Sequence, residues 1–384
     1  MSGAIDDAAE LAGDRPLRVL VTAPLARKPG GVAQYIRVLQ PYLGKDVQYF
    51  TVGKRSDDER IGKTLVRMAR DVTLFERTLR VGDYDLVHLN PSFSPKALIR
   101  DGILLTIAKA YHKAVIVTTH GWNERFERTC VAHLSWLFRL VYGRATAFVV
   151  LSKVFRDKLY ALGYANHVFV QVPPIEDQLL AECRQEYRRR RLRAGKEFNI
   201  LFLARVERAK GIYEALDTYR LLKRQHPFVS LTVAGDGSEL TNAVRYADSQ
   251  DLADVAFRGH VTGAAKYDVF RAADAYLFPS HTEGLPISML EAMAFGLPVV
   301  TCAVGGLRDW FQNGAMGFMT NTQDPEMLAL FLSRLIREPI LRSNISLFNR
   351  EYVRDQCTGA EVAARIAGIY RFILDRAHQP FLHA

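Results

Sequence analysis

The chain has 384 residues, of which 49% are hydrophobic and 24% are charged, with a formal net charge of +10. This length is too great for one ordinary hydrophobic core, and the composition of an average globular protein excludes extensive disorder. The apolar runs are far shorter than the ~20 residues of a membrane-spanning helix. The positive charge favours anionic partners, which include phosphate esters, nucleic acids and acidic membrane surfaces.

Two features favour a cytoplasmic location. The stretch Met1–Arg15 is acidic and lacks the positive start and apolar run of a secretory signal. The cysteines are scattered, without the paired spacing of a disulfide or zinc framework: Cys130, Cys183, Cys302 and Cys357. We therefore expect reduced thiols.

The first half alternates short β-rich runs with longer amphipathic stretches, the pattern of parallel α/β domains. It predicts a strand at Arg18–Thr22 and a helix at Gly31–Leu43. Further buried strands are expected at Asp85–Leu89, Ala114–Thr118, Ala147–Leu151 and Val168–Val172. Pro173 and Pro174 then end this half and begin a linker.

The second half repeats this pattern of strand, basic loop, glycine and helix. Its strands are expected at Asn199–Leu203, Ser230–Ala234, Val255–Arg258, Ala275–Phe278 and Pro298–Thr301, with a last helix at Ala360–Leu374. We predict two doubly wound, Rossmann-like domains, at 1–175 and 198–358. A linker at 176–197 joins them, and 359–384 packs back on the first. Because ligands bind beyond the carboxyl ends of such strands, the domains should share a cleft.

The strongest motif lies in Ser280–Val300. Glu283 and Glu291 are separated by seven residues, and Pro286 suits the first turn of a helix. Glu283 then lies in the loop before this helix and Glu291 inside it. The backbone N–H groups of Gly284 and Leu285 would face the cleft at a helix start, which attracts anions and hydroxyl-rich ligands.

This motif, with Gly296-Leu297-Pro298-Val299-Val300 after it, resembles the signature of the retaining GT-B glycosyltransferases of family four, the glycosyl transferases group 1. The resemblance covers nearly the whole chain and is strongest over 199–321. It implies a GT-B fold and transfer of a sugar, expected to be a hexose, from a nucleotide diphosphate donor with retention. It assigns Glu283 to the transferred sugar and Glu291 to the ribose hydroxyls. Outside such a motif, both glutamates would be interpreted as solvated charges.

The segment Ala204–Gly211 joins a strand to a helix and carries three cations. The resemblance assigns Arg205 and Lys210 to the leaving diphosphate, whose growing charge must be neutralised. Arg208 is interpreted as a solvated loop charge. Asp83-Tyr84-Asp85 is interpreted as a turn rather than a metal motif, and no ligand cluster with metal spacing appears. We expect neither a metal nor a cofactor.

Weaker signals complete the predicted site. Gly30 and Gly31 follow the first strand and match the acceptor-side loop of the family, where Gly31 would approach the donor phosphates. His120, at the end of a strand, is a candidate contact to the donor sugar. Gly235 and His260 lie in segments that resemble the nucleotide-binding turns. An ordinary turn or a structural histidine is the alternative for each.

A membrane contact is the last expectation. Ile61–Leu79 has apolar residues at helical spacing, with Arg60, Lys63, Arg67, Arg70, Arg77 and Arg80 beside them. We expect the apolar stripe to cover the sheet and the arginines to be available to an anionic membrane. Trp136–Tyr142 and the linker arginines Arg188–Arg191 and Arg193 are further candidates. The resemblance implies a glycan or lipid-linked acceptor in cell-surface polysaccharide synthesis, at the inner face of the plasma membrane.

The sequence leaves two other functions open. One is a GT-B-fold sugar nucleotide epimerase or hydrolase, which would turn over the donor without an acceptor. The other is a transferase-like binding partner without activity, against which the intact Glu283, Glu291, Arg205 and Lys210 argue. The positive net charge would suit nucleic-acid binding, but the sequence contains no nucleic-acid recognition motif.

Overall fold

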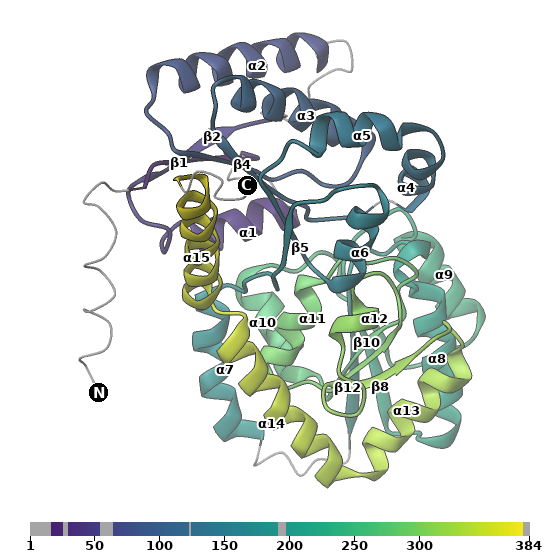
Figure 1. The fold of residues 1–384 in the computed structure, drawn as a ribbon. Helices are drawn as coiled ribbons and strands as arrows, with labels where there is room; N and C mark the ends of the chain where they lie inside the picture. Colours follow the sequence, from purple (N-terminus) through teal and green to yellow (C-terminus); the bar gives the residue numbers. More distant parts are fainter. Residues whose placement is uncertain (1–16, 26–29, 54–63, 123, 191–196, 379–384) are drawn as a thin grey trace.

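The structure is a computed structural model that describes residues 17–25, 30–53, 64–122, 124–190 and 197–378. Within these ranges the strands form two six-stranded sheets, and every neighbouring pair of strands is parallel. Helices cover both sheets, and each sheet belongs to one domain (Figure 1). The α/β class with two Rossmann-like domains, predicted from the sequence, is confirmed.

The first sheet has the strand order β2-β1-β3-β4-β5-β6. Its central strands are fully buried runs, as expected of a parallel sheet covered on both faces. The strands are β1 (Val19–Ala23), β2 (Val47–Thr51), β3 (Leu86–Leu89), β4 (Ala114–Thr118), β5 (Ala147–Val150) and β6 (His167–Val170). The sequence analysis missed β2 because this edge strand is only half-buried and mixes polar with apolar residues.

The second sheet has the order β12-β11-β10-β7-β8-β9. Its strands are β7 (Phe198–Leu203), β8 (Val229–Ala234), β9 (Val255–Phe257), β10 (Ala275–Phe278), β11 (Val299–Cys302) and β12 (Gly317–Thr320). The sequence analysis also missed β12, a short edge strand that begins at a glycine. In both sheets the chain reverses its direction of winding beside the first strand, and the ends of β1 and β7 therefore mark the ligand-binding edge.

The helices of the first domain include α1, which begins at Gly31 as predicted but ends at Leu39 rather than Leu43. The helices are α1 (Gly31–Leu39), α2 (Thr64–Val81), α3 (Pro95–Ala110), α4 (Glu124–Thr129), the π-helical segment η2 (Cys130–Leu134), α5 (Ser135–Tyr142) and α6 (Lys153–Ala161). The apolar stripe of α2 packs inward, since Phe75 and Leu79 are buried.

The helices of the second domain lie on both faces of its sheet. They are the 3-10 turn η3 (Arg208–Lys210), α8 (Ile212–Gln225), α9 (Leu240–Ser249), α10 (Gly263–Ala272), α11 (Ile287–Ala294), α12 (Leu307–Trp310), α13 (Pro325–Arg337) and α14 (Pro339–Gln356).

Two segments join the domains. The range 176–197, expected to be a linker, contains helix α7 (Asp177–Arg190), which lies against α10 and α11. Helix α15 (Gly359–His378) follows α14 and crosses to the first domain, beside α1 (Figure 1). There Val362, Ile366 and Tyr370 are buried in one hydrophobic core with β1 and α1. The first domain is therefore completed by the end of the described chain.

Some predicted basic positions cannot be placed. Arg60, Lys63, Arg191 and Arg193 lie outside the described residues, as do the side chains of 188–190. None of the described helices is both long enough and apolar enough to cross a bilayer.

Candidate active site

The carboxyl ends of the two sheets face each other across two adjoining cavities. The smaller, of about 340 Å³, is lined by Gly31, Gln34, Tyr35 and His120 from the first domain and by Arg205, Lys210, Glu283, Leu285 and Ser288, among others, from the second. The larger, of about 580 Å³, is lined by Gly30, Arg37, Gly235, His260, Lys266 and Glu291, among others. Gln34, Ala204, Arg205, Ile287 and Ser288 line both cavities.

These walls contain every predicted site residue except Gly284. The carbonyl of Gly284 instead accepts a hydrogen bond from the backbone N–H of Gly306, at 3.1 Å. A Cβ built on Gly284 would lie 3.4 Å from Leu151 in the first domain. Gly284 thus lies where the two domains meet, beside the cavities. Pro286 precedes helix α11 by one residue and caps it, instead of occupying its first turn.

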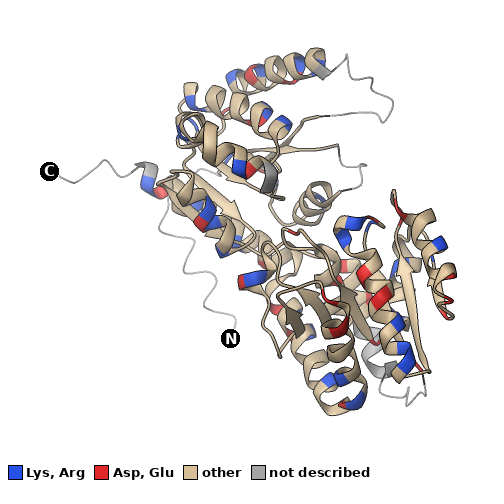
Figure 2. Cartoon of the chain, turned by 90° about the vertical axis from the view of Figure 1, so that its right-hand side faces the viewer, with Lys and Arg blue, Asp and Glu red and all other residues tan. Residues whose placement is uncertain are grey.

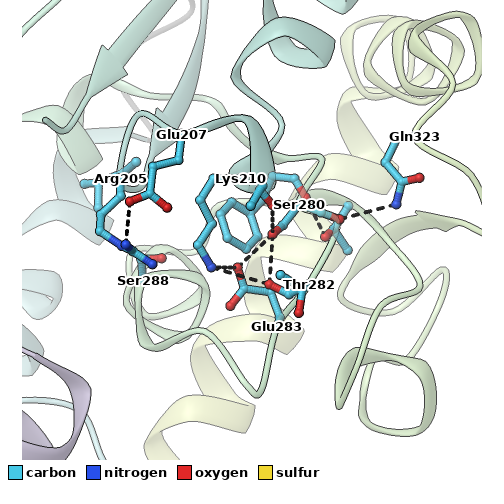
Figure 3. Close-up of polar contacts among 12 residues, drawn as sticks. Arg205, Glu207, Lys210, Ser280, Thr282, Glu283, Ser288 and Gln323 are labelled. Carbon is cyan, nitrogen blue, oxygen red and sulfur yellow. Dashed lines mark hydrogen bonds and ion pairs between the residues drawn. The ribbon is translucent and has the colours of Figure 1, made fainter. Parts of the chain in front are cut away.

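The side chain of Glu283 is fixed by interactions with its Oε1 atom. Lys210 Nζ lies 2.5 Å from this oxygen, and the hydroxyl of Ser280 donates to it at 2.9 Å (Figure 3). The Lys210 and Glu283 side chains are only 16% and 9% exposed. Glu283, predicted to contact the sugar, and Lys210, predicted to contact the phosphates, therefore form an ion pair. The hydrogen bonds described at Glu283 leave its Oε2 atom available to a ligand.

Two glycines hold the backbone of Glu283 in this position. Gly305 has a φ of +49°, and a Cβ there would lie 1.7 Å from the Glu283 carbonyl oxygen. No side chain fits in that space, and residues with a Cβ rarely adopt such a φ, whereas glycine does so readily. Gly306, which follows, holds Gly284 through the backbone bond already described. Gly305 and Gly306 are therefore required for packing against the Glu283–Gly284 backbone.

Glu291 is buried inside helix α11, and its Oε1 accepts two hydrogen bonds. Lys266 Nζ donates at 2.7 Å, and Gln34 Nε2, from α1 of the first domain, donates at 3.1 Å. Burial raises the pKa of Glu291, and the neighbouring Lys266 ammonium opposes this shift. The sequence analysis missed both partners, because neither lies in a motif and one contact spans the two domains.

The cations at the end of β7 differ in exposure. Arg205 is 67% exposed, borders both cavities and pairs with Glu207 at 2.5 Å. Arg208 is 74% exposed and lies over the ring of Tyr213, 4.7 Å from its centroid. Neither of the two cavities is lined by Arg208, in keeping with its interpretation as a solvated charge.

His120 follows β4 and lines the smaller cavity. Its Nε2 lies 2.8 Å from Asn90 Oδ1, and the ring of Tyr35 packs edge-on against it at 4.5 Å. Burial lowers the pKa of His120 to about 3, with a smaller contribution from His88. The imidazole is therefore neutral at neutral pH.

The predicted glycines contribute to the site through their backbone conformation. Gly30 caps α1 with a φ of +134°, so that Gly31 begins a helix whose N-terminus faces the cleft. A Cβ on Gly235 would lie 1.8 Å from the carbonyl oxygen of Ala204. Asp85 accepts a hydrogen bond from the backbone N–H of Arg18, and Asp83-Tyr84-Asp85 is the segment directly before β3. Across the described ranges, no group of three or more His, Cys, Asp or Glu residues is placed to hold a metal ion.

Comparisons with known proteins agree with this geometry. Residues 184–352 match the family model described as glycosyl transferases group 1. Glycogen synthase of Mycobacterium tuberculosis is 26% identical, over 69% of this chain and 65% of its own length. The capsular polysaccharide biosynthesis glycosyltransferase CapM of Staphylococcus aureus is 26% identical, over 46% of this chain and 47% of its own. The matched regions thus span less than two thirds of these relatives.

A solved structure extends the likeness to the whole fold. HepE of Anabaena, in complex with UDP and glucose, superposes with a TM-score of 0.68 over 93% of this chain and 100% of its own, at 17% identity. The fold therefore defines the class: a GT-B fold, as in glycosyltransferases. The sequence match adds that residues 184–352, which include most of the second domain, match the glycosyl transferases group 1, and the resemblance predicted from the sequence is confirmed.

Proposed function

We propose that this protein transfers a sugar, expected to be a hexose, from a nucleoside diphosphate sugar to an acceptor hydroxyl. The observation that carries the proposal is the cluster of Glu283, Lys210, Arg205 and Glu291 around two connected cavities, with both domains contributing walls. The two cavities together suit a ligand with two parts. The smaller would hold the sugar and the larger the nucleoside.

The donor diphosphate would lie where the cavities join. Arg205 borders both, and Lys210 and the N-terminus of α1 at Gly31 border the smaller. A guanidinium, an ammonium and a helix N-terminus are all groups that attract phosphate. Glu291 would accept hydrogen bonds from the ribose hydroxyls, with Gly235 and His260 near the base.

The chemistry follows from where charge develops. As the bond between the anomeric carbon and the diphosphate breaks, negative charge grows on the leaving oxygen and positive charge on the sugar ring. Arg205 and Lys210 would stabilise the first, and the Glu283 carboxylate the second. The acceptor oxygen forms the new bond to the anomeric carbon, and its proton leaves with the diphosphate. Retention follows if the acceptor attacks the face from which the diphosphate departs.

We also propose that no metal ion takes part, since the two side-chain cations already face the diphosphate position. Calorimetric titration with UDP-, GDP- and ADP-glucose in excess EDTA tests the donor site. We expect one of these to bind, and Arg205→Ala to weaken the binding. HepE was solved with UDP and glucose, which makes UDP-glucose the first choice. If no donor binds in EDTA and added magnesium restores binding, the proposal that no metal ion takes part is contradicted.

A third cavity, separate from the two between the domains, supports a lipid-linked acceptor. It has about 580 Å³, lies between α3 and the α4–α5 segment, and has an almost wholly apolar lining that includes Leu98, Ile103, Phe126, Leu134, Leu137 and Val141. Trp136 and Leu140 lie on the same helix, α5, but do not line this cavity, and they are 61% and 62% exposed. An apolar cavity of this size suits a hydrocarbon chain, and the exposed apolar side chains of α5 suit contact with a bilayer surface.

The charge of the surrounding surface complements an anionic leaflet. Arg128 and Arg139 are exposed on α4 and α5. Figure 2 shows both basic and acidic residues on the helices at the top of the molecule, where α2 and α3 lie in Figure 1, and the basic ones are in excess. We therefore propose peripheral attachment to the inner face of the plasma membrane, with a lipid chain in this cavity. A role in cell-surface polysaccharide synthesis agrees with the capsular polysaccharide biosynthesis for which CapM is named.

Product analysis separates the alternatives. A transferase releases nucleoside diphosphate at a rate that depends on the acceptor. An epimerase or hydrolase of the same fold would convert the donor without an acceptor, and a non-catalytic partner would bind the donor unchanged.

A further inference from the structure

Beneath the smaller cavity, Asn90 is locked in one orientation. This residue follows β3 and is buried, and its backbone N–H donates to Thr22 Oγ1 at 3.1 Å. Its side-chain Nδ2 donates to the backbone oxygens of Thr22, at 3.0 Å, and His88, at 3.4 Å. Carbonyl oxygens only accept hydrogen bonds, so the carboxamide cannot be flipped without placing its oxygen against two others.

This orientation determines which nitrogen of His120 carries the proton. Asn90 Oδ1 lies 2.8 Å from His120 Nε2, and an amide oxygen can only accept. Nε2 must therefore be the N–H of the imidazole. In a neutral ring the other nitrogen, Nδ1, then keeps its lone pair.

The neighbourhood of His120 keeps the ring neutral and in place. Tyr35 covers its edge, and no acidic side chain of the described residues makes a hydrogen bond or ion pair with it. His88, the nearby second histidine, is occupied by Tyr370 at 2.7 Å and Thr118 at 2.6 Å. No described hydrogen bond uses Nδ1 of His120, although the residue lines the cavity.

We propose that Asn90 is a positioning residue that fixes the Nε2–H tautomer of His120, so that Nδ1 accepts a hydrogen bond from one hydroxyl of the donor sugar. The proposal rests on the proposed donor site. It assigns a specificity: at that position of the sugar the site selects a hydroxyl over a hydrogen or a carboxylate. A hydrogen forms no bond with the lone pair, and an ionised carboxylate has no proton to donate.

The tautomer is measurable without any ligand. In protein labelled with 15N-histidine, long-range proton–nitrogen spectra distinguish the two neutral tautomers and the imidazolium, and His120→Gln assigns the signal. We expect a neutral Nε2–H ring in the wild type at neutral pH. In Asn90→Ala the signal should change to a mixture of tautomers, whereas Asn166→Ala, an asparagine away from the cleft that bonds two backbone carbonyls, should leave it unchanged. An Nδ1–H ring in the wild type would overturn the proposal.

The sugar contact is tested with UDP-glucose, its 2-, 3-, 4- and 6-deoxy forms and UDP-glucuronate. Wild-type protein should bind one deoxy form about tenfold more weakly than UDP-glucose, the factor typical of one lost hydrogen bond. His120→Gln should remove that difference, because its amide N–H can still reach Asn90 but no acceptor remains at Nδ1. His120→Asn, whose Oδ1 takes the place of Nδ1, should restore part of it.

An error in the proposed donor site and an error in the proposed His120 contact would give different experimental results. If UDP-glucose and all its analogues fail to bind, the UDP-sugar donor site is wrong, while the tautomer result still decides the role of Asn90. If UDP-glucose binds and no deoxy form discriminates between wild type and His120→Gln, the hydroxyl contact is wrong although the donor site stands.

Discussion

The ammonium of Lys210 lies 2.5 Å from the carboxylate of Glu283 and makes a second, longer bond to the carbonyl of Thr282. These two side chains come from the end of β7 and the end of β10, far apart in the sequence, and both face the smaller cavity. In the proposed reaction they stabilise opposite charges, one on the sugar and one on the diphosphate. Their pairing holds both in place before the donor enters.

Lys210→Met should lower kcat for transfer by about 100-fold, because it removes a cation facing the leaving diphosphate. Arg208→Met is the matched control, since this cation lies on the same short turn but outside both cavities. We expect the control to stay within about twofold of the wild type, as a change to an exposed charge usually does. Steady-state kinetics checks both variants, and equal losses in the two would contradict the assignment of Lys210.

Gly305→Ala should displace the Glu283 loop. The added Cβ would lie 1.7 Å from the Glu283 carbonyl oxygen, and the φ of +49° adds strain. We expect a loss of unfolding free energy of about 1–3 kcal/mol together with weaker donor binding. Gly314→Ala has a similarly unfavourable φ of +88° but open space around its Cβ. The control should lose stability without losing donor binding; unchanged donor binding in Gly305→Ala would show that the loop position does not matter.

The buried histidines predict a loss of stability in acid. Burial lowers the pKa of His88 to about 3 from an ordinary value of 6.5, so the unfolded chain binds a proton that the folded chain excludes. Stability is complete above pH 6.5 and falls as the pH decreases toward 3, by up to ~1.4 kcal/mol per pH unit for this one residue. Denaturant unfolding at a series of pH values should show a shallower fall in His88→Gln. An identical slope in both proteins would disprove the linkage.

The exposed apolar side chains of α5 predict binding to anionic vesicles. Trp136 is exposed, whereas Trp122 and Trp310 are largely covered, so a blue shift of tryptophan emission on binding reports mainly on Trp136. We expect sedimentation with vesicles of phosphatidylcholine and phosphatidylglycerol but little with phosphatidylcholine alone. Leu140→Asp should weaken this binding, and Leu330→Asp, at an exposed leucine of the second domain, should not. Vesicle binding that Leu140→Asp leaves intact, or a dimer formed through this face, would exclude the lipid assignment.

The parts of the fold and site that could be predicted from the sequence are those with a local signal. Buried parallel strands such as β5 and β10 are continuous apolar runs, and the Glu283–Glu291 motif combines helix start, spacing and glycines in one stretch. The edge strands β2 and β12 lack such runs, and α7 lies in a segment whose many charges suggested a linker.

The missed site residues have a different cause. Gln34, Lys266 and Asn90 act through contacts to residues far away in the chain, and two of these contacts depend on how β3 lies beside β4 and how the domains meet. A glutamine in a helix or an asparagine after a strand has no spacing that marks it. Their importance becomes visible only when the partners Glu291 and His120 are seen beside them.

The most direct test of the central claim is the release of nucleoside diphosphate from UDP-glucose in the presence of a membrane extract as the source of acceptor and excess EDTA. We predict acceptor-dependent release by the wild type and a fall of at least about 100-fold in Glu283→Ala, with an unchanged circular dichroism spectrum. Undiminished release by the variant would contradict the account, because the carboxylate that faces the sugar would then play no part in the transfer.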